Sequence, residues 1–151
     1  MKSTFYILAV CLTLFACDKN NAEEQAAEDD TVIQNYISDN NLIAEATGSG
    51  LYVVIDNEGT GASCSATSTV KVEYTGYFTH GTQFDSSPSG GIEFPLQNVI
   101  LGWTEGIPYF KEGGSGKLLI PSALAYGPNG TTGIPPNSVL IFEIELIEVI
   151  E

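Results

Sequence analysis

Apolar and polar residues alternate along two segments of the chain, and this alternation constrains the fold more than any other feature of the sequence. In residues 70–75 every second residue is Val or Tyr. Within a strand predicted over residues 139–149, one parity of residues 140–146 is apolar and the other carries glutamates: Leu140, Phe142, Ile144 and Leu146 against Glu143 and Glu145. A period of two is typical of a strand that buries one face. The chain is therefore predicted to contain a sheet with one apolar and one solvated face.

The segments between these two predict the other elements. Residues 98–110 are expected to hold the main helix, a short one because Gly106 and Pro108 disfavour its continuation. Further short strands are predicted around residues 51–55, 92–94 and 117–120. About five antiparallel strands and one short helix make an α+β arrangement, with the sheet folded around the helix. A ligand-sized hollow is expected between them.

The first sixteen residues have the pattern of an export signal. Lys2 supplies a positive charge, and an apolar run of about eleven residues follows, shorter than the roughly 20 needed to span a bilayer. The ending Leu-Phe-Ala-Cys17 resembles the lipobox of bacterial lipoproteins. We expect residues 1–16 to be a lipoprotein signal peptide and Cys17 to carry the lipid. The alternative is an ordinary cleaved signal peptide.

Residues 17–48 are expected to form an acidic tether with one short helix. The segment after Cys17 is polar and has no aromatic residue before position 36, which is typical of a solvated linker. Asp29 or Asp30 is a suitable cap for a short helix with apolar residues on one face within positions 32–37. Asn40 would end this helix. The folded domain is then predicted to occupy residues 49–151.

Charge and cysteine usage exclude several classes of function. Nineteen Asp and Glu against five Lys and Arg give a formal charge of −14, which argues against nucleic acid as a partner. Once Cys11 leaves with the signal and Cys17 is lipidated, Cys64 has no disulfide partner within the chain. His80 is the only His and is expected on a solvent-facing turn. No metal site is therefore predicted.

Aromatic residues concentrate between positions 72 and 103 or soon after, which predicts an aromatic-lined pocket. Asp85 lies directly beside Phe84 and is the candidate polar group of that pocket. The loop of residues 121–136 is unusually long, and such loops are often functional. From the residues alone the chain is an apolar-pocket binding domain. Three other rings, Phe78, Phe94 and Phe110, are assigned to core or surface.

Six motifs occur in order from about residue 70 to residue 147. They are Val72-Glu-Tyr-Thr-Gly76, Phe84-Asp-Ser-Ser87, Val99-Ile-x-Gly-Trp103-x-x-Gly106, Ala125-Tyr-Gly127, Ile134-Pro-Pro136 and Leu140-x-Phe-x-Ile-x-Leu146. In this combination the chain resembles the FKBP-type peptidyl-prolyl isomerases. The resemblance covers over half of the chain.

The resemblance implies two groups of site residues. The residues implied to be catalytic are Phe84, Asp85, Trp103 and Tyr126. The residues implied to bind substrate are Tyr74, Ile92, Val99, Ile100, Ile134 and Phe142. Trp103 would be the floor of the pocket, and the Tyr126 hydroxyl would meet a ligand carbonyl.

The resemblance further implies the activity and the partners. The expected function is acceleration of Xaa-Pro isomerisation during folding of exported proteins, with no cofactor. Expected ligands are proline-containing segments and macrolide inhibitors, and the lipid would attach the chain to the membrane of a bacterial cell envelope. A monomer is expected, because the long N-terminal helical region that makes some envelope relatives dimers is not predicted. The alternatives are a non-catalytic chaperone that uses the same pocket and a structural anchor for an envelope complex.

Overall fold

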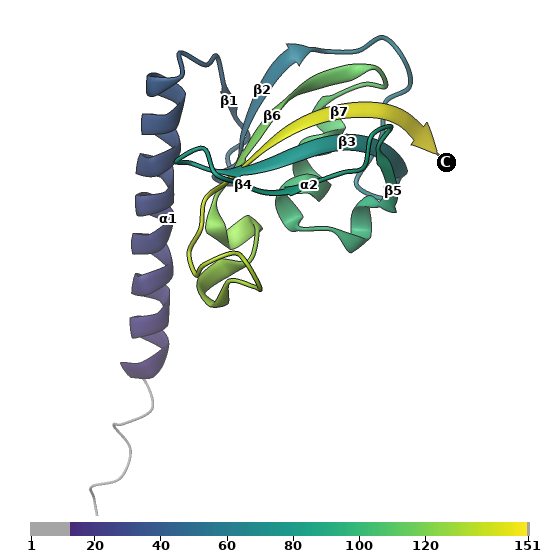
Figure 1. The fold of residues 1–151 in the computed structure, drawn as a ribbon. Helices are drawn as coiled ribbons and strands as arrows, with labels where there is room; N and C mark the ends of the chain where they lie inside the picture. Colours follow the sequence, from purple (N-terminus) through teal and green to yellow (C-terminus); the bar gives the residue numbers. More distant parts are fainter. Residues whose placement is uncertain (1–12, 151) are drawn as a thin grey trace, which may run out of the picture.

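Seven strands form one curved antiparallel sheet in the computed structural model, which describes residues 13–150 (Figure 1). The strands are β1 (Glu45–Ala46), β2 (Tyr52–Asn57), β3 (Thr69–Phe78), β4 (Gln83–Ser86), β5 (Ile92–Pro95), β6 (Gly114–Ile120) and β7 (Leu140–Ile150). Their order across the sheet is β1-β2-β6-β7-β3-β4, and β5 also pairs with β3. The expected α+β fold, a curved antiparallel sheet around a short helix, is confirmed.

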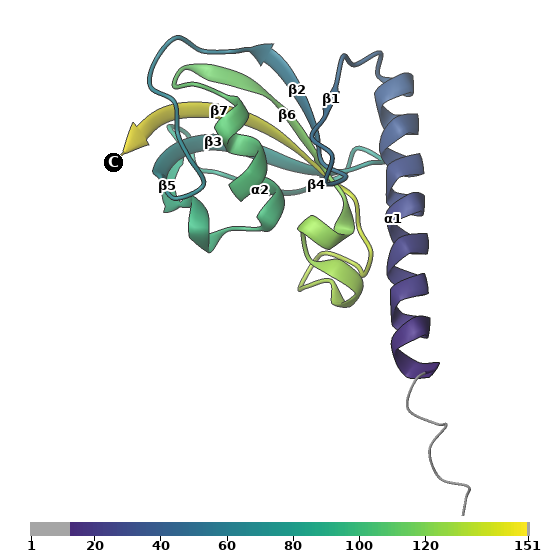
Figure 2. The ribbon, with the colours of Figure 1, turned by 180° about the vertical axis from the view of Figure 1, so that it is seen from behind.

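Strand β7 follows the predicted alternation of buried and exposed residues. Leu140, Phe142, Ile144 and Leu146 are buried, whereas Glu143 and Glu145 are exposed. The buried parity faces helix α2 (Leu101–Gly106), which lies in the concave side of the sheet (Figures 1 and 2). The helix is shorter than the predicted 98–110, because the chain continues as a 3₁₀ turn, Ile107–Tyr109, that contains Pro108.

Two glycines let helix α2 lie close to strand β6. A Cβ built on Gly102 would come within 2.5 Å of the Ile120 side chain, and one on Gly106 within 2.7 Å of the Leu118 side chain. Any larger residue would push the helix off the sheet. These glycines therefore set the depth at which Trp103, between them, lies under the sheet.

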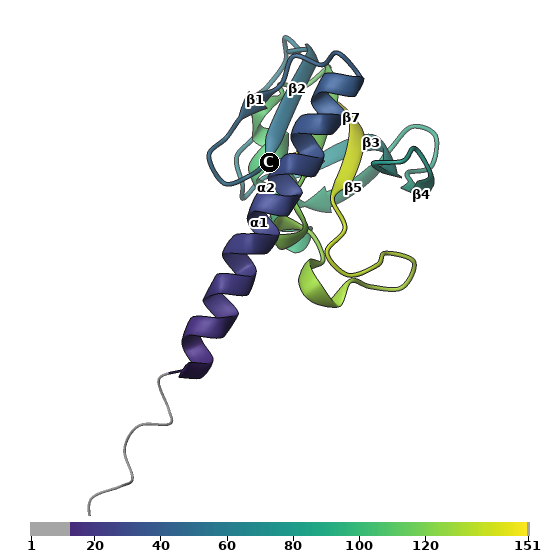
Figure 3. The ribbon, with the colours of Figure 1, turned by 90° about the vertical axis from the view of Figure 1, so that its left-hand side faces the viewer.

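Helix α1 (Thr13–Asp39) is 27 residues long and stands beside one end of the sheet (Figures 1 and 3). The prediction of a solvated tether with a helix that begins near residue 30 was wrong about this length. Residues 22–27 are Ala, Glu and Gln, which all have high helix propensity. The helix therefore continues through the acidic segment, and its N-terminal half extends past the sheet in Figure 1.

The C-terminal half of α1 covers part of the outer, convex face of the sheet. Four residues that pair across strands face it there: Tyr52, Leu119, Ile141 and Tyr77. Ile33 is fully buried against this row, and Tyr36 and Ile37 pack beside it. The prediction of a sheet with a single buried face was therefore incomplete, because the last turns of α1 bury a patch on the other face.

The signal peptide, the lipid on Cys17 and the monomeric state all remain predictions. Residues 1–12, most of the expected signal peptide, lie outside the described residues, and so does the Cys17 side chain. Within residues 13–150, no helix combines the length and the apolar content needed to cross a membrane. The expectation of a monomer assumed that there is no long N-terminal helix, and α1 removes that premise.

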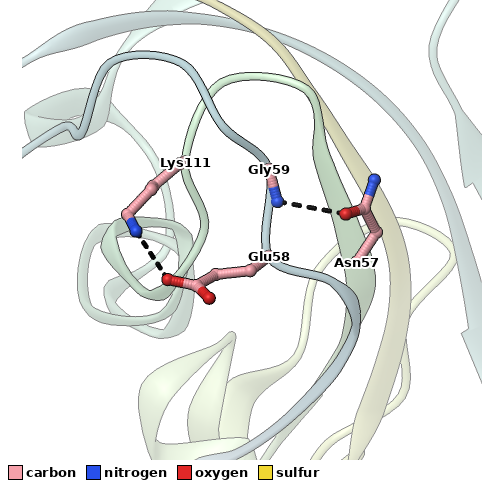
Figure 4. A network of polar contacts seen from close by, with 4 residues as sticks. All are labelled: Asn57, Glu58, Gly59 and Lys111. Atoms are coloured by element: carbon pink, nitrogen blue, oxygen red, sulfur yellow. Dashed lines mark hydrogen bonds and ion pairs between the residues drawn. The ribbon is translucent and has the colours of Figure 1, made fainter.

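At the opposite end of the sheet, polar contacts fasten the turn after β2 (Figure 4). Lys111 Nζ lies 2.6 Å from Glu58 Oε1, and the Gly59 amide donates a 3.2 Å hydrogen bond to Asn57 Oδ1. The Lys111 ammonium lowers the pKa of the Glu58 carboxyl by hydrogen bonding. This exposed network joins the turn to the segment just before β6.

Candidate functional site

A cavity of about 470 Å³ opens between the concave face of the sheet, helix α2 and the loop after β6. Most of the site residues proposed from the sequence line it: Tyr74, Asp85, Ile92, Val99, Ile100, Trp103, Tyr126 and Phe142. They come from strands β3, β4, β5 and β7, from helix α2 and its N-terminal flank, and from the loop. This volume lies within the range of small-ligand sites, roughly 300–1,000 Å³.

Aromatic rings form the deep part of the cavity. The Trp103 ring centroid lies 4.8 Å from Tyr74, 5.1 Å from Phe94 and 5.1 Å from Phe142. The contacts with Tyr74 and Phe142 are edge-to-face, which is a favourable geometry for aromatic pairs. Trp103 is 5% exposed and Phe142 4%. The rings therefore support one another and leave an apolar hollow above the indole.

The Trp103 indole Nε1–H has no hydrogen-bond partner among the described residues, although it is buried. A buried donor without an acceptor costs about 1–3 kcal/mol. Such a cost is tolerated where the position of the ring matters more than satisfaction of its N–H. The indole is thus held by packing with the surrounding core and rings, without a hydrogen bond from its Nε1–H.

The polar wall of the cavity centres on Asp85. Its Oδ2 accepts a 2.9 Å hydrogen bond from the Tyr74 hydroxyl, and its Oδ1 accepts a 2.9 Å hydrogen bond from the Ser86 amide. Burial, then the hydrogen bond to Asp85 and its charge, raise the pKa of Tyr74 to about 12. Tyr74 is consequently a neutral donor at physiological pH.

Tyr126 brings a second phenol to the cavity from the loop. Its side chain is 39% exposed, and its hydroxyl makes no hydrogen bond to another described residue. Burial and the negative charge of Asp85 raise the pKa of Tyr126. The hydroxyl therefore stays protonated at neutral pH and can donate to a ligand.

An extended backbone segment forms part of the rim. Val99 has φ −114° and ψ 177°, and Ile100, the residue before helix α2, has φ −60° and ψ 147°. The Ile100 carbonyl accepts from the Trp103 and Thr104 amides, which fixes the segment to the helix. Among the described hydrogen bonds none uses the Ile100 amide. A bound peptide could pair with this amide.

Two residues proposed from the sequence do not line the cavity. The Phe84 ring lies 5.5 Å from Phe142 and 4.9 Å from Phe78, so it packs with the rings at the wall. Ile134 is buried in the main core, with 8% of its side chain exposed. Both positions stabilise the cavity rather than form its surface.

Three lining residues were not proposed from the sequence: Phe94, Asn98 and Ala125. Phe94 was assigned to core or surface, yet its ring forms part of the wall. The period of two in β5 could have revealed it, since Phe94 shares a parity with the proposed Ile92. Ala125 belongs to the Ala125-Tyr-Gly127 motif, which could have revealed it, whereas Asn98 carries no sequence signal of its own.

Other chemically notable residues lie elsewhere. Cys64 is half-buried against the core, and burial raises the pKa of its thiol. His80 is exposed and stacks on Phe78 with centroids 5.5 Å apart. Neither lines the cavity. The part of the chain that the structure describes holds no cluster of three or more His, Cys, Asp or Glu suited to a metal ion.

Comparison with known proteins identifies the family. The family model described as FKBP-type peptidyl-prolyl cis-trans isomerase matches residues 61–147. A protein from Aeromonas hydrophila, FKBP-type peptidyl-prolyl cis-trans isomerase FkpA, is 41% identical over 140 residues, which cover 91% of this chain and 51% of the relative. A probable FKBP-type isomerase from Haemophilus influenzae is 45% identical over 70% of this chain and 45% of its own length. The chain thus spans about half the length of these curated relatives.

Solved structures agree. The crystal structure of a peptidyl-prolyl cis-trans isomerase from Pseudomonas syringae pv. tomato superposes with a TM-score of 0.75 at 32% identity, covering 85% of this chain and 96% of that one. The crystal structure of FkpA from Escherichia coli gives a TM-score of 0.72 at 34% identity, covering 98% of this chain and 75% of that one. Taken with the family match over residues 61–147, these similarities show that the chain belongs to the FKBP-type peptidyl-prolyl cis-trans isomerase family.

Proposed function

We propose that this chain accelerates cis-trans isomerisation of Xaa-Pro bonds during the folding of exported proteins. The observation that carries the proposal is the ring-walled cavity of about 470 Å³, which has one carboxylate and one available phenol at its edge. Membership of the FKBP-type family supports the reaction type. The cavity size suits a prolyl ring and its neighbours.

The reaction requires no group that breaks a bond. Amide resonance creates a rotation barrier of about 18–20 kcal/mol, and uncatalysed X-Pro exchange takes tens to hundreds of seconds. In the twisted transition state the amide loses resonance, and its charge separation falls. An apolar cavity therefore favours this state over the planar ground state, which water solvates better. Each 1.36 kcal/mol of such preference is worth about tenfold in rate.

Different side chains would supply the apolar surface, the hydrogen-bond donor and the positioning contact. Trp103 and Phe142 supply the apolar surface against which the prolyl ring would pack. The Tyr126 hydroxyl would donate to the carbonyl before the proline, since it is protonated and makes no bond to another described residue. Asp85 holds Tyr74 in place by accepting the hydrogen bond from its hydroxyl. The rotation needs no nucleophile, metal or cofactor.

A protease-coupled assay on a Xaa-Pro peptide tests the proposal. The chain should raise the isomerisation rate in proportion to its concentration, and a macrolide ligand of FKBP-type pockets should suppress the gain. A folded protein that gives only the uncatalysed rate would refute the activity. Circular dichroism of the same sample establishes that it is folded.

The proposed setting is the bacterial cell envelope, reached by export and lipidation at Cys17. Support comes from the lipobox-like residues before Cys17. Labelled palmitate should enter the wild-type chain and not a Cys17→Ser variant expressed in the same cells.

A second candidate is peptide binding without turnover. A further cavity of about 430 Å³ lies between helix α1, the tip of the β3–β4 hairpin and the loop before β7, and it favours this candidate because it offers extra surface to an unfolded chain. Suppression of aggregation that survives Tyr126→Phe, with no isomerase activity in either protein, would favour it over catalysis.

A further inference from the structure

A buried carboxylate joins helix α1 to the loop that carries Tyr126. Asp29 is 2% exposed and Ser122 is 1% exposed. Asp29 Oδ2 accepts hydrogen bonds from the Ser122 amide at 2.7 Å and from the Ser122 hydroxyl at 2.6 Å. Its Oδ1 accepts a 2.8 Å hydrogen bond from Gln25 Nε2. The sequence suggested Asp29 as a cap for its own helix. In the structure Asp29 instead accepts hydrogen bonds from Ser122, the first residue of a 3₁₀ turn.

The position of Asp29 follows from the packing of α1. Asp29, Ile33 and Tyr36 lie on one face of the helix, at i, i+4 and i+7. Ile33 packs on the outer face of the sheet with Leu119 of β6. Strand β6 ends one residue later, and Ser122 begins a short 3₁₀ turn, Ser122–Leu124. The apolar contact at Ile33 therefore brings Asp29, one turn toward the N-terminus, to the start of the loop. Helix α1 and this loop lie side by side in Figures 1 and 3.

A tight turn transmits this anchor to the cavity. The Leu124 amide donates to the Pro121 carbonyl and the Ala125 amide to the Ser122 carbonyl, both at 3.0 Å. Ala125 and the next residue, Tyr126, both line the ring-walled cavity. Because the turn is closed by these bonds, a shift of Ser122 would shift Tyr126.

One apolar and one polar contact attach this loop to α1: Val139 packs in the same buried cluster as Ile33, and Asp29 binds Ser122. The cavity of about 430 Å³ separates the helix residues Gln25, Glu28 and Val32 from the later part of the loop, residues 135–139. Among the side chains of residues 21–150, the hydrogen bonds from α1 to the loop all come from Asp29. Asp29 is thus the polar attachment of the loop's first turn, the turn that leads to Tyr126.

We propose that Asp29 is a positioning residue for the isomerase reaction, because it holds Ser122 and thereby places the Tyr126 hydroxyl at the cavity. The inference rests on the proposed function. It gives helix α1 an indirect role in substrate binding, through the loop that carries Tyr126.

Substitution of Asp29 tests the proposal. Asp29→Ala leaves the buried Ser122 donors unsatisfied and should lower kcat/KM by up to about fivefold, the full loss expected when the Tyr126 hydroxyl itself is removed. Asp29→Asn keeps one acceptor oxygen and should recover part of the loss. Tyr52→Phe is the matched control, because it removes the hydroxyl that bonds Asp30 at 2.8 Å and Gln34 at 2.7 Å, a contact of α1 with the sheet alone. This control should keep wild-type kcat/KM.

A double-mutant cycle distinguishes positioning from general destabilisation. If Asp29 acts through the Tyr126 hydroxyl, Asp29→Ala should have little further effect on kcat/KM in a Tyr126→Phe background. An equal loss in both backgrounds, or a folded Asp29→Ala protein with wild-type kcat/KM, would overturn the proposal. If Asp29→Ala does not fold, Ser122→Ala, which removes only the hydroxyl bond, replaces it in the cycle.

Amide hydrogen exchange supplies a readout that does not depend on activity. In Asp29→Ala the Leu124 and Ala125 amides should exchange faster, whereas the amides between β6 and β7 should not change. Unchanged exchange in the turn would contradict the positioning role. Should the wild type show no isomerase activity, the proposed function fails, and the exchange result still decides whether Asp29 holds the loop.

Discussion

The Tyr74 hydroxyl donates a 2.9 Å hydrogen bond to Asp85 Oδ2, which links β3 to β4 at the cavity wall. The other oxygen of Asp85 is held by the Ser86 amide, so the carboxylate has a fixed orientation. Its negative charge, added to burial, raises the pKa of Tyr74 and of Tyr126. One carboxylate thereby raises the pH at which two phenols of the cavity ionise.

The raised pKa of Tyr74 predicts how stability depends on pH. With a folded-state pKa of about 12, above the ordinary value of about 10, Tyr74 is protonated in both states below pH ~10. From about pH 10 to 12 the unfolded chain loses its proton first, so the free energy of unfolding should fall as pH rises. Denaturant midpoints measured across this range should decline less steeply for Tyr74→Phe than for the wild type. Parallel declines would contradict this.

Asp85→Asn should lower the pKa of both Tyr74 and Tyr126, because the charge that opposes their ionisation is removed. Ultraviolet titration of phenolate formation measures this shift. Glu148→Gln, at an exposed position on β7, is a control that should leave the titration unchanged. Identical curves for Asp85→Asn and the wild type would show that the carboxylate does not act on the phenols.

Tyr126→Phe should lower kcat/KM about fivefold, the equivalent of one neutral hydrogen bond of about 1 kcal/mol. Tyr109→Phe is a matched control, since Tyr109 is also 39% exposed and does not line the cavity. Steady-state isomerisation assays compare the two variants. An equal effect of both substitutions would exclude a specific role for the Tyr126 hydroxyl.

Gly76→Ala should disturb the aromatic wall. A Cβ at this position would lie 2.7 Å from the Phe84 ring and 2.9 Å from the Phe142 ring, closer than real Cβ contacts. Overpacking of this kind costs about 1–3 kcal/mol. The free energy of unfolding, measured with urea, should fall by that amount, and kcat/KM should fall as Phe142 moves. Thr75→Ala, on the other face of the same strand, should leave kcat/KM unchanged.

The alternation in residues 140–146 predicted the sheet correctly, because a period of two reports directly which face of a strand is buried. The length of helix α1 was underestimated, since a run of Ala, Glu and Gln suits both a helix and a solvated linker. The apolar contact of Ile33 with the outer face of the sheet favours the helix over the linker, and this contact joins residues that are far apart in the sequence.

The lining of the cavity was predicted only in part, because it too depends on contacts between distant parts of the sequence. Trp103 and Phe142 line it as expected, but Phe84 packs with the wall and Phe94 takes a place on its surface. Which ring lines the cavity depends on how the strands pair and on the absence of a side chain at Gly76, where the Phe84 and Phe142 rings pack. Neither can be read from the identity of the aromatic residue alone. Asp29 could not be connected with Ser122 from sequence, because the two residues are 93 positions apart.

Exchange NMR of a Xaa-Pro peptide, with the chain present in catalytic amounts, tests the central claim most directly. The account predicts exchange cross-peaks between the cis and trans forms at mixing times too short for the uncatalysed reaction. Those cross-peaks should weaken for Tyr126→Phe and remain for Tyr109→Phe. Absence of exchange with a folded wild-type chain whose cavity binds the peptide would contradict the account, because the cavity would then bind proline without promoting its rotation.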